Sequence, residues 1–288
     1  MKGFSISQIL LVISSALWPL LAHAAPPKQI LKLPFTIKKP GAYQLSKNLT
    51  FSGTGNAIQV EADDVTIDMK GYTITFDGTI TADQQPAGIY ALDQKNITIR
   101  NGVIQDFHRG IFLDSGNVIF AAGGHLVENI RADRCHSAGI EVEGRGSMLR
   151  NNWISNVRRV MSGTANTYGM RVSGSGLTIQ SNRINDVYVP LGNNANVAHG
   201  ITVDTGDSCR VVDNQISNTS LSVNISSVGL VMTNCAYAIV AGNHIIRSAA
   251  GIQFVDSDDL RYRDNTVTGA LQAYFNDGTA DAGTGNLP

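Results

Sequence analysis

One pattern recurs along most of this 288-residue chain and limits what it can fold into. Each copy begins with Gly, continues with apolar residues that alternate with polar ones, and reaches Asn after a short break. The alternation is typical of a β-strand with one buried face. Such a repeat predicts a solenoid, in which each unit buries its apolar edge only by stacking on its neighbours. The clearest copies open at Gly88, Gly110, Gly139, Gly169, Gly200, Gly229 and Gly251.

Five asparagines share one register in successive units. Asn tolerates the left-handed backbone of a tight turn, and its amide can bond to the Asn above and below. We therefore predict a structural ladder at these positions rather than catalysis. The opening Gly of each unit is predicted to occupy a bend that a side chain would crowd. The ladder residues are Asn152, Asn182, Asn214, Asn243 and Asn265.

Length variation is concentrated at one place in the unit. The separation from Gly to Asn is 13 or 14 residues in six of the seven units, and 19 in the unit that opens at Gly110. Insertions follow the Asn, at residues 158–168, 188–199 and 219–228. Insertions confined to one location project from one face of a repeat protein, and that face is often the binding face.

The two ends of the chain differ from its middle. Residues 1–24 are similar to a secretory signal, with Lys2, an apolar run from Ile9 to Leu21, and Ala22-His23-Ala24 as a cleavage site. We therefore expect a secreted or periplasmic protein; a retained anchor or a buried helix is the alternative. We predict an N-terminal cap over 25–56, a β-helix over 57–270, and a C-terminal cap or tail over 271–288.

Composition limits the partners. The formal net charge of −1 argues against a nucleic-acid binder. After signal cleavage we expect no membrane span. Three cysteines are too few for a disulfide scaffold; a Cys209–Cys235 bridge is possible, but buried free thiols are favoured. No His/Cys spacing predicts a metal site. Acidic turns at residues 204–207 and 256–259 offer oxygen ligands for calcium, although such turns are common without metal.

Three features together resemble one known superfamily. They are the cap sequence PGAYQLSKNLTF (40–51), the segment VTIDMKGYTI (65–74), and the repeated GIxV and xNxI coils. They resemble the pectate-lyase-like, single-stranded right-handed parallel β-helix superfamily over roughly residues 35–270. The resemblance implies an all-β solenoid of three parallel sheets, with long loops beside the first sheet. Many members bind or cleave acidic polysaccharides between that sheet and those loops.

The resemblance does not extend to a named enzyme family. Polygalacturonase-like members carry Asn-Thr-Asp, Asp-Asp and Gly-His-Gly at successive first strands. Here Ala198-His199-Gly200 is similar only to the last of these, and the preceding coils have no Asp-Asp. The Arg-x-Pro-x-x-Arg pattern of pectate lyases is missing from the sequence as well. Because a fold does not carry a reaction with it, the activity stays open.

Stacking the coils at ~4.8 Å places equivalent positions in rows along the axis. The middle coils would then gather charged groups next to aromatic rings, which suits a sugar with an apolar face and polar hydroxyls. Two residues after each Gly, the outward row is Tyr90, Phe112, Glu141, Arg171, Thr202, Val231 and Gln253. Four residues after each Gly it is Leu92, Asp114, Glu143, Ser173, Asp204, Thr233 and Val255. The residues that enter these strands include His108, Arg109, His136, Tyr168 and His199.

Two reactions fit this face. In a β-elimination, Arg171 or Arg109 would neutralise a uronate carboxylate, and His136, His199 or Tyr168 would take the C5 proton. In a hydrolysis, two carboxylates would act as acid and base. The predicted catalytic residues are Glu141, Arg171, His136, His199 and Tyr168. The predicted substrate-binding residues are Tyr90, Phe112, Asp114, Glu143, Arg109, His108 and Asp204. The expected partner is a polysaccharide, in particular an acidic one.

Structural explanations compete with each of these assignments. Glu141 and Arg171 would be neighbours, so they could form a surface ion pair worth ~0–1 kcal/mol. Tyr90 and Phe112 could pack under an N-terminal loop. Arg210, Arg261 and Arg263 are expected near one another on the second sheet, where a mixed-charge face would explain them. The alternative function is a structural or adhesive scaffold, and a third is a periplasmic accessory protein for a cofactor or metal.

Overall fold

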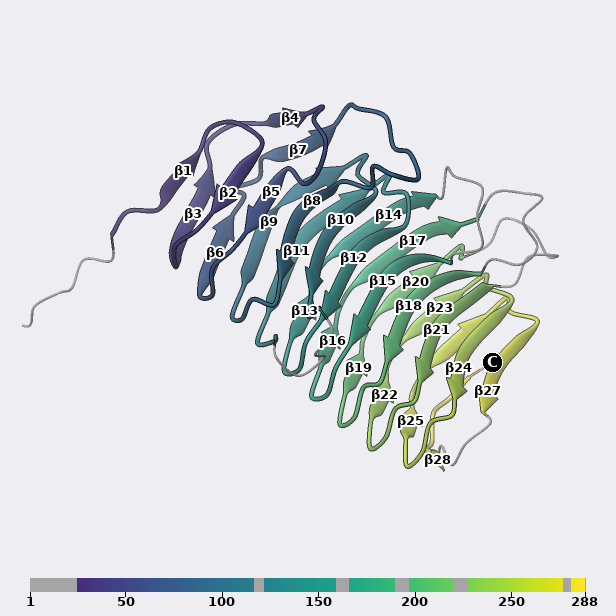
Figure 1. Cartoon of the computed structure of the whole chain (residues 1–288). Coiled ribbons are helices and arrows are strands. Elements are labelled where there is room, and N and C mark those ends of the chain that lie inside the picture. Colours follow the sequence, from purple (N-terminus) through teal and green to yellow (C-terminus); the bar gives the residue numbers. More distant parts are fainter. Residues whose placement is uncertain are drawn as a thin grey trace, which may run out of the picture.

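The computed structural model describes residues 25–116, 122–158, 166–189, 197–219, 227–276 and 281–287. The predicted signal segment lies outside these residues. Within them the regular elements are all β-strands, and every pairing between the strands is parallel. Successive coils stack as rungs along one axis (Figure 1). The predicted all-β solenoid is therefore confirmed.

Ten strands, one from each coil, form the ten-stranded sheet. Its central strands are six or seven residues long, and each bonds to the equivalent strand of the next coil. In order they are β2 (Phe35–Ile37), β5 (Ile58–Val60), β8 (Ala87–Leu92), β10 (Arg109–Asp114), β12 (Ala138–Glu143), β15 (Thr167–Ser173), β18 (Ala198–Asp204), β21 (Ser227–Thr233), β24 (Ala250–Val255) and β27 (Gln272–Asn276).

The other eighteen strands form two parallel ladders, which the long strands β9 and β11 join. The second ladder is β1 (Lys28–Ile30), β3 (Gly41–Leu45), β6 (Val65–Asp68), β9 (Thr98–Gln105), β11 (Leu126–Asp133), β13 (Met148–Arg150), β16 (Thr178–Gln180), β19 (Arg210–Val212), β22 (Ile239–Ala241), β25 (Arg261–Arg263) and β28 (Asp281–Ala282). The third ladder adds β4 (Leu49–Phe51), β7 (Thr73–Phe76), β14 (Trp153–Arg158), β17 (Arg183–Tyr188), β20 (Gln215–Ser217), β23 (His244–Ile246) and β26 (Thr266–Thr268).

The predicted asparagine ladder runs through the interior. The Asn182 amide donates to Asn214 Oδ1 at 3.0 Å and to the Leu149 carbonyl at 2.9 Å, and the other four asparagines repeat this arrangement. Asn286 extends the ladder by one rung. Towards the N-terminus, Ile130 takes the ladder position, and its N–H donates to Asn152 Oδ1. The repeat's Asn in that coil, Asn129, lies one residue earlier, exposed within β11 with φ of 53°.

The opening glycines allow adjacent coils to approach closely. A Cβ on Gly139 would lie 2.8 Å from the Gly169 carbonyl oxygen and 2.5 Å from Cγ2 of Ile154. Both separations are shorter than a real side chain tolerates. The expected crowding at this bend is confirmed, and it comes from the backbone of the next coil.

The insertions lie where the repeat pattern places them, between the third strand of one coil and the first strand of the next. They connect β14 to β15, β17 to β18, and β20 to β21 (Figure 1). Their central parts, residues 159–165, 190–196 and 220–226, are outside the described residues. The coil with the longest Gly-to-Asn separation gains its extra length elsewhere, between β10 and β11.

The three cysteines are buried and free, as favoured from the sequence. Burial raises the pKa of the Cys209 thiol to about 11 and that of Cys235 to about 12. The two thiols therefore stay protonated near neutral pH.

Candidate functional site

The ten-stranded sheet holds its outward side chains in the predicted rows. Phe112 is opposite Tyr90 and Glu141, Arg171 is opposite Glu141 and Thr202, and the register continues to Gln253. Because every rung is in register, side chains from coils about thirty residues apart in sequence become neighbours.

Four of these side chains form a continuous chain of ion pairs, here called the charged row: Arg109, Glu141, Arg171 and Asp204. Arg109 Nε donates to Glu141 Oε2 at 2.6 Å. Arg171 Nη1 donates to Glu141 Oε1 at 3.0 Å, and Arg171 Nε donates to Asp204 Oδ2 at 3.0 Å. Glu141 thus accepts from one arginine of each adjacent coil, so the row spans neighbouring coils.

Glu141 forms the ion pair with Arg171 that competed with its catalytic assignment, but its carboxylate is buried and not on the surface. It is only 4% exposed, and both its oxygens accept from guanidinium groups. A buried carboxylate is tolerated because the two arginines compensate the cost of removing its charge from water. Although burial lowers the pKa of Arg171, hydrogen bonding to Asp204 and the charges of Asp204 and Glu141 raise it overall.

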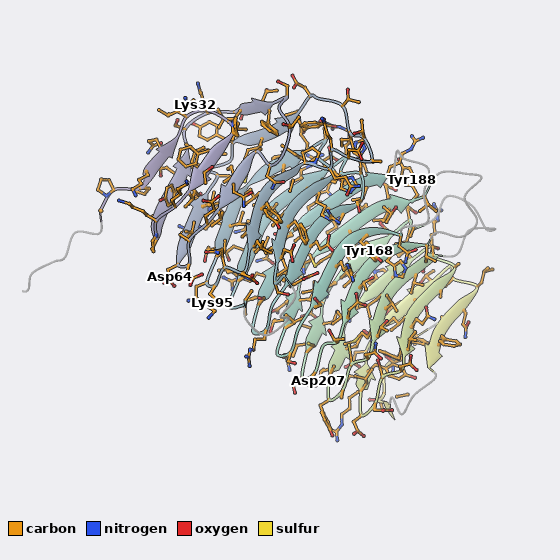
Figure 2. The ribbon with its side chains drawn as sticks, in the orientation of Figure 1. Lys32, Asp64, Lys95, Tyr168, Tyr188 and Asp207 are labelled. Atoms are coloured by element: carbon orange, nitrogen blue, oxygen red, sulfur yellow. The ribbon has the colours of Figure 1, made fainter. Side chains whose placement is uncertain are left out.

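His199 and Tyr168 lie beside the charged row. Their rings are 5.3 Å apart between centroids, and the Arg171 guanidinium lies 5.5 Å from the centre of the Tyr168 ring. Tyr168 occupies the middle of the solenoid (Figure 2). Both ring nitrogens of His199 are covered and have no hydrogen-bond partner among the described residues. Burial, and then the Arg171 charge, lower the pKa of His199 to about 4, so the imidazole is neutral near pH 7.

The N-terminal part of the face is aromatic and acidic. The Tyr90 and Phe112 rings are 5.4 Å apart, and the Arg109 guanidinium covers Phe112 at 4.6 Å. The Tyr90 hydroxyl donates to Asp114 Oδ2 at 3.3 Å, and burial together with Asp114 raises the pKa of Tyr90 to about 12. Burial and the Asp114 charge also raise the pKa of Glu143, which accepts from Ser115 Oγ at 3.1 Å.

His108 and His136 lie at the turns that precede the sheet. His108 is buried, at 3% exposure, and its carbonyl accepts from the Ser137 N–H. Burial lowers the pKa of His136, and the charged group that acts on it is Asp106, not a member of the charged row. The structure therefore brings His199 and Tyr168 to Arg171, and associates His136 with another corner of the coil.

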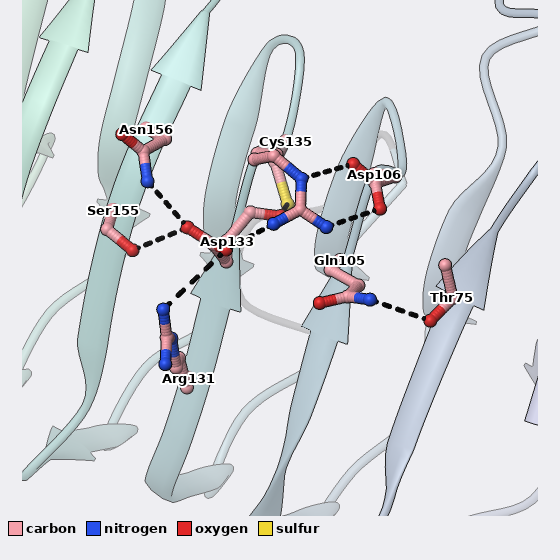
Figure 3. A network of polar contacts seen from close by, with 9 residues as sticks. Thr75, Gln105, Asp106, Arg131, Asp133, Cys135, Ser155 and Asn156 are labelled. Atoms are coloured by element: carbon pink, nitrogen blue, oxygen red, sulfur yellow. Dashed lines mark hydrogen bonds and ion pairs between the residues drawn. The ribbon is translucent and has the colours of Figure 1, made fainter. Parts of the chain in front are cut away.

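That corner belongs to a separate polar network on the outside of the third ladder (Figure 3). Arg134 donates to both oxygens of Asp106, at 2.7 and 2.8 Å. Asp133 accepts from Arg134, Ser155 and Asn156, at 2.7 to 2.8 Å. Burial alone would raise the pKa of Asp133, but these hydrogen bonds and the arginine charges lower it overall. Every group is used in joining adjacent coils, so the network is structural.

Sequence reasoning overlooked two features. Thr202, next to Arg171 in the outward row, is buried, and its hydroxyl has no hydrogen-bond partner among the described residues. Its place in the row was the available signal. The second feature is a groove of about 430 Å³ over β19, β22 and β25. It contains the three arginines that the sequence placed together.

Within the described part of the chain, no helix is long and apolar enough to cross a membrane. The same residues contain no group of three His, Cys, Asp or Glu side chains arranged to hold a metal ion.

Comparisons with known proteins agree with the architecture. A family model described as a right-handed β-helix region matches residues 41–216 and 158–276. A search of curated protein sequences finds no match.

Solved structures share the fold at low sequence identity. The periplasmic alginate epimerase AlgG superposes with a TM-score of 0.57 at 11% identity, over 86% of this chain and 76% of that one. The Dettilon tailspike protein gives 0.60 at 11%, over 90% and 56%. The enzymatically active domain of bacteriophage CBA120 tailspike protein 2 gives 0.54 at 13%, over 89% and 42%. This chain spans only 61% of an epimerase variant, 42% of the CBA120 domain and 56% of the Dettilon protein.

Proposed function

This chain belongs to the right-handed β-helix family, and from that membership we propose that its ten-stranded sheet binds an acidic polysaccharide and abstracts a proton from it. The observation that carries the proposal is the position of a neutral His199 beside Tyr168 and Arg171, with no hydrogen-bond partner for either ring nitrogen among the described residues. A general base must be unprotonated at working pH and within reach of the proton that it takes. His199 meets the first condition, and because both its nitrogens are covered, substrate binding must displace the groups that cover them to meet the second.

The reaction also requires that the C5 proton of the uronate be made more acidic, and Arg171 is placed to do this. A guanidinium that pairs with a uronate carboxylate withdraws charge from it and makes the adjacent C5–H more acidic. Nε and Nη1 of Arg171 already donate to Asp204 and Glu141, and its side chain keeps 37% exposure. We expect the remaining donors to face the substrate. Arg109, Phe112 and Tyr90 extend the face for neighbouring sugars, because aromatic rings suit the apolar side of a pyranose.

The proposed step is a β-elimination. His199 takes the C5 proton, and the electron pair of the C5–H bond becomes the C4–C5 double bond. The bond from C4 to the glycosidic oxygen breaks, and a proton donor, for which Tyr168 is placed, delivers a proton to that oxygen. Return of a proton to C5 from the opposite face would instead give epimerisation. Both outcomes begin with the same abstraction.

The structural relatives support the choice of substrate only through what their descriptions state. One is an alginate epimerase described as periplasmic, and others are tailspike proteins. Alginate and other uronate polymers are therefore the first substrates to try. The leader-like residues 1–24 support a secreted or periplasmic location, where such polymers occur.

A second candidate function is glycoside hydrolysis at the N-terminal part of the face. Glu143 has a raised pKa, as a general acid requires, and Asp114 is the charge that acts on it. The non-enzymatic alternative, an adhesive scaffold, would use the same face for binding alone.

The test uses the full chain with alginate and polygalacturonate in D₂O. Epimerisation predicts deuterium at C5 of the product by NMR, whereas elimination leaves a C4–C5 double bond with no hydrogen at C5 and is followed by its ultraviolet absorbance. His199→Gln is expected to lower the rate at least ~10²-fold, the usual contribution of a general base. His244→Gln, on an exposed histidine of β23, is the matched control and should leave the rate unchanged.

Three results would reject this assignment. New reducing ends with neither deuterium at C5 nor ultraviolet absorbance, lost in Glu143→Gln, would establish the hydrolase. Full activity of His199→Gln together with loss of activity in His136→Gln would identify His136, at the other corner of the coil, as the general base. Binding of the polysaccharide without formation of any product would favour the non-enzymatic, adhesive scaffold.

A further inference from the structure

A groove with an apolar floor and basic rims lies over the second ladder, near the C-terminal end of the solenoid. Arg210, Ile239 and Arg261 occupy one row on β19, β22 and β25, and Val212, Ala241 and Arg263 occupy the row two residues later. The three arginines are exposed, Val212 is buried, and Ile239 and Ala241 are half-buried. The groove has a volume of about 430 Å³, within the range of small-ligand sites.

The groove carries positive charge that the protein does not neutralise. Among the described residues, the guanidiniums of Arg210 and Arg261 have no ion-pair or hydrogen-bond partner. Arg263 has only an exposed contact with its sequence neighbour Asp264, at 3.2 Å. In the charged row, by contrast, Arg109 and Arg171 both pair with carboxylates. Two aligned guanidiniums without an ion-pair partner among the described side chains therefore distinguish this groove from the charged row, although Asp281 lies opposite Arg261 in the register of β28.

The spacing of the two charges suits an extended ligand. One rung separates Arg210 from Arg261, so their Cα atoms are about 9.6 Å apart along the axis at ~4.8 Å per rung. The floor between them is the Ile239 side chain, with Val212 and Ala241 beside it. A small inorganic anion would meet one guanidinium without using the floor, and a neutral sugar would use the floor without the charges.

We propose that this groove is a second binding site for a carboxylate-bearing polysaccharide, held along the solenoid axis. Each guanidinium presents a planar fork of donors that matches a carboxylate with two parallel hydrogen bonds. The C–H face of an intervening sugar covers Ile239 and Ala241. The choice of polymer rests on the proposed function, but the site itself is separate from the charged row. It would hold the polymer, not transform it.

The test measures binding of fluorescent alginate and polygalacturonate oligomers, about ten sugars long, to the full chain. All proteins carry Arg171→Ala, which weakens the ten-stranded sheet's own site. Adding Arg210→Gln and Arg261→Gln is expected to weaken the remaining binding at least tenfold. Adding Arg247→Gln and Arg183→Gln instead, on two exposed arginines outside the groove, is the charge-matched control and should change it less than twofold.

Two outcomes would overturn the proposal. One is an equal effect of the control and groove variants, which would mean that only net charge matters. The other is equal competition by dextran sulfate of the same length, which would mean a general anion site without preference for carboxylate.

A parallel assay separates this inference from the proposed function. Turnover of short oligomers is compared between the wild type and the double groove variant. Equal turnover combined with unchanged binding would reject the groove and leave the catalytic proposal standing. Loss of binding in the groove variant, with no turnover in any protein, would retain the groove and reject the catalysis.

Discussion

At the scale of single residues, His199 shows how a row position sets the protonation of a side chain. It lies in β18 between Tyr168 and Val228 of the adjacent coils, and both its nitrogens are covered. A histidine in such a place keeps its neutral form because burial penalises the imidazolium and Arg171 repels it. The same environment that makes it a candidate base therefore links the protein's stability to pH.

We predict that His199 lowers stability in acid. Its pKa is about 4 in the folded protein against an ordinary value of 6.5, so between these values the unfolded chain binds a proton that the folded chain does not. Stability from this group is complete above about pH 6.5 and is lost as the pH falls through 4, by about 3 kcal/mol in total. Urea midpoints at about pH 7 and pH 4 measure it. The loss should be smaller by that amount in His199→Gln.

The control is His244→Gln, on an exposed histidine, which should lose as much stability in acid as the wild type. His125, whose pKa burial also lowers to about 4, is present in every protein and cancels in the comparison. An identical pH dependence of the wild type and His199→Gln would contradict the prediction.

At the scale of one element, the asparagine turn joins three coils. Asn214 Oδ1 accepts from both the backbone N–H and the amide of Asn182, and its own amide donates to the Ile179 carbonyl and to Asn243. Each of these groups is buried, so a substitution without polar atoms leaves several of them unpaired at once.

We predict that Asn214→Ala lowers the free energy of unfolding by several kcal/mol, since each buried unpaired group costs ~1–3 kcal/mol. Gln215→Ala, on the exposed neighbour in the same turn, should change it by less than ~0.5 kcal/mol. Chemical denaturation followed by circular dichroism compares them. Equal stability of the two variants would show that water replaces the ladder.

At the scale of the molecule, the solenoid separates stability from recognition. The interior is a continuous apolar column, and near the N-terminus it is filled by stacked rings: Phe107 lies 5.5 Å from Phe76 and 6.5 Å from Phe51. Phe112, five residues later, is a half-buried outward side chain of the ten-stranded sheet and contacts Tyr90 and Arg109.

We predict opposite consequences for these two phenylalanines. Phe107→Ala should lower the free energy of unfolding by ~3–5 kcal/mol, the usual cost of emptying an aromatic core site. Phe112→Ala should cost less than ~1.5 kcal/mol in stability but weaken polysaccharide binding several-fold. Calorimetry and oligomer binding on both variants measure this. Equal losses of stability in Phe107→Ala and Phe112→Ala would contradict the separation of stability from recognition.

Most of the architecture could be predicted from the sequence, because every coil of the solenoid repeats the same residue pattern. Gly139 could be assigned to the bend and Asn152 to the ladder because the equivalent positions of neighbouring coils carry the same residue types. Outward rows could be listed for the same reason. Burial of Glu141 could not be foreseen, because it depends on Arg109 and Arg171 reaching it from both sides. His136 sits three residues before Gly139 and was grouped with His199, but its turn faces Asp106.

The asparagine ladder also has a direction. From Asn152 to Asn265, each side-chain amide donates to the carbonyl oxygen of the asparagine in the following coil. The amide dipoles therefore point the same way and add, as peptide dipoles do along an α-helix, with the positive end towards the last coils. The two ends of a chain with a net charge of −1 are thus electrically unequal. At the positive end the terminal amide, that of Asn286, donates to the backbone carbonyls of Tyr262 and Gly283, which satisfy the donors that no further coil can take.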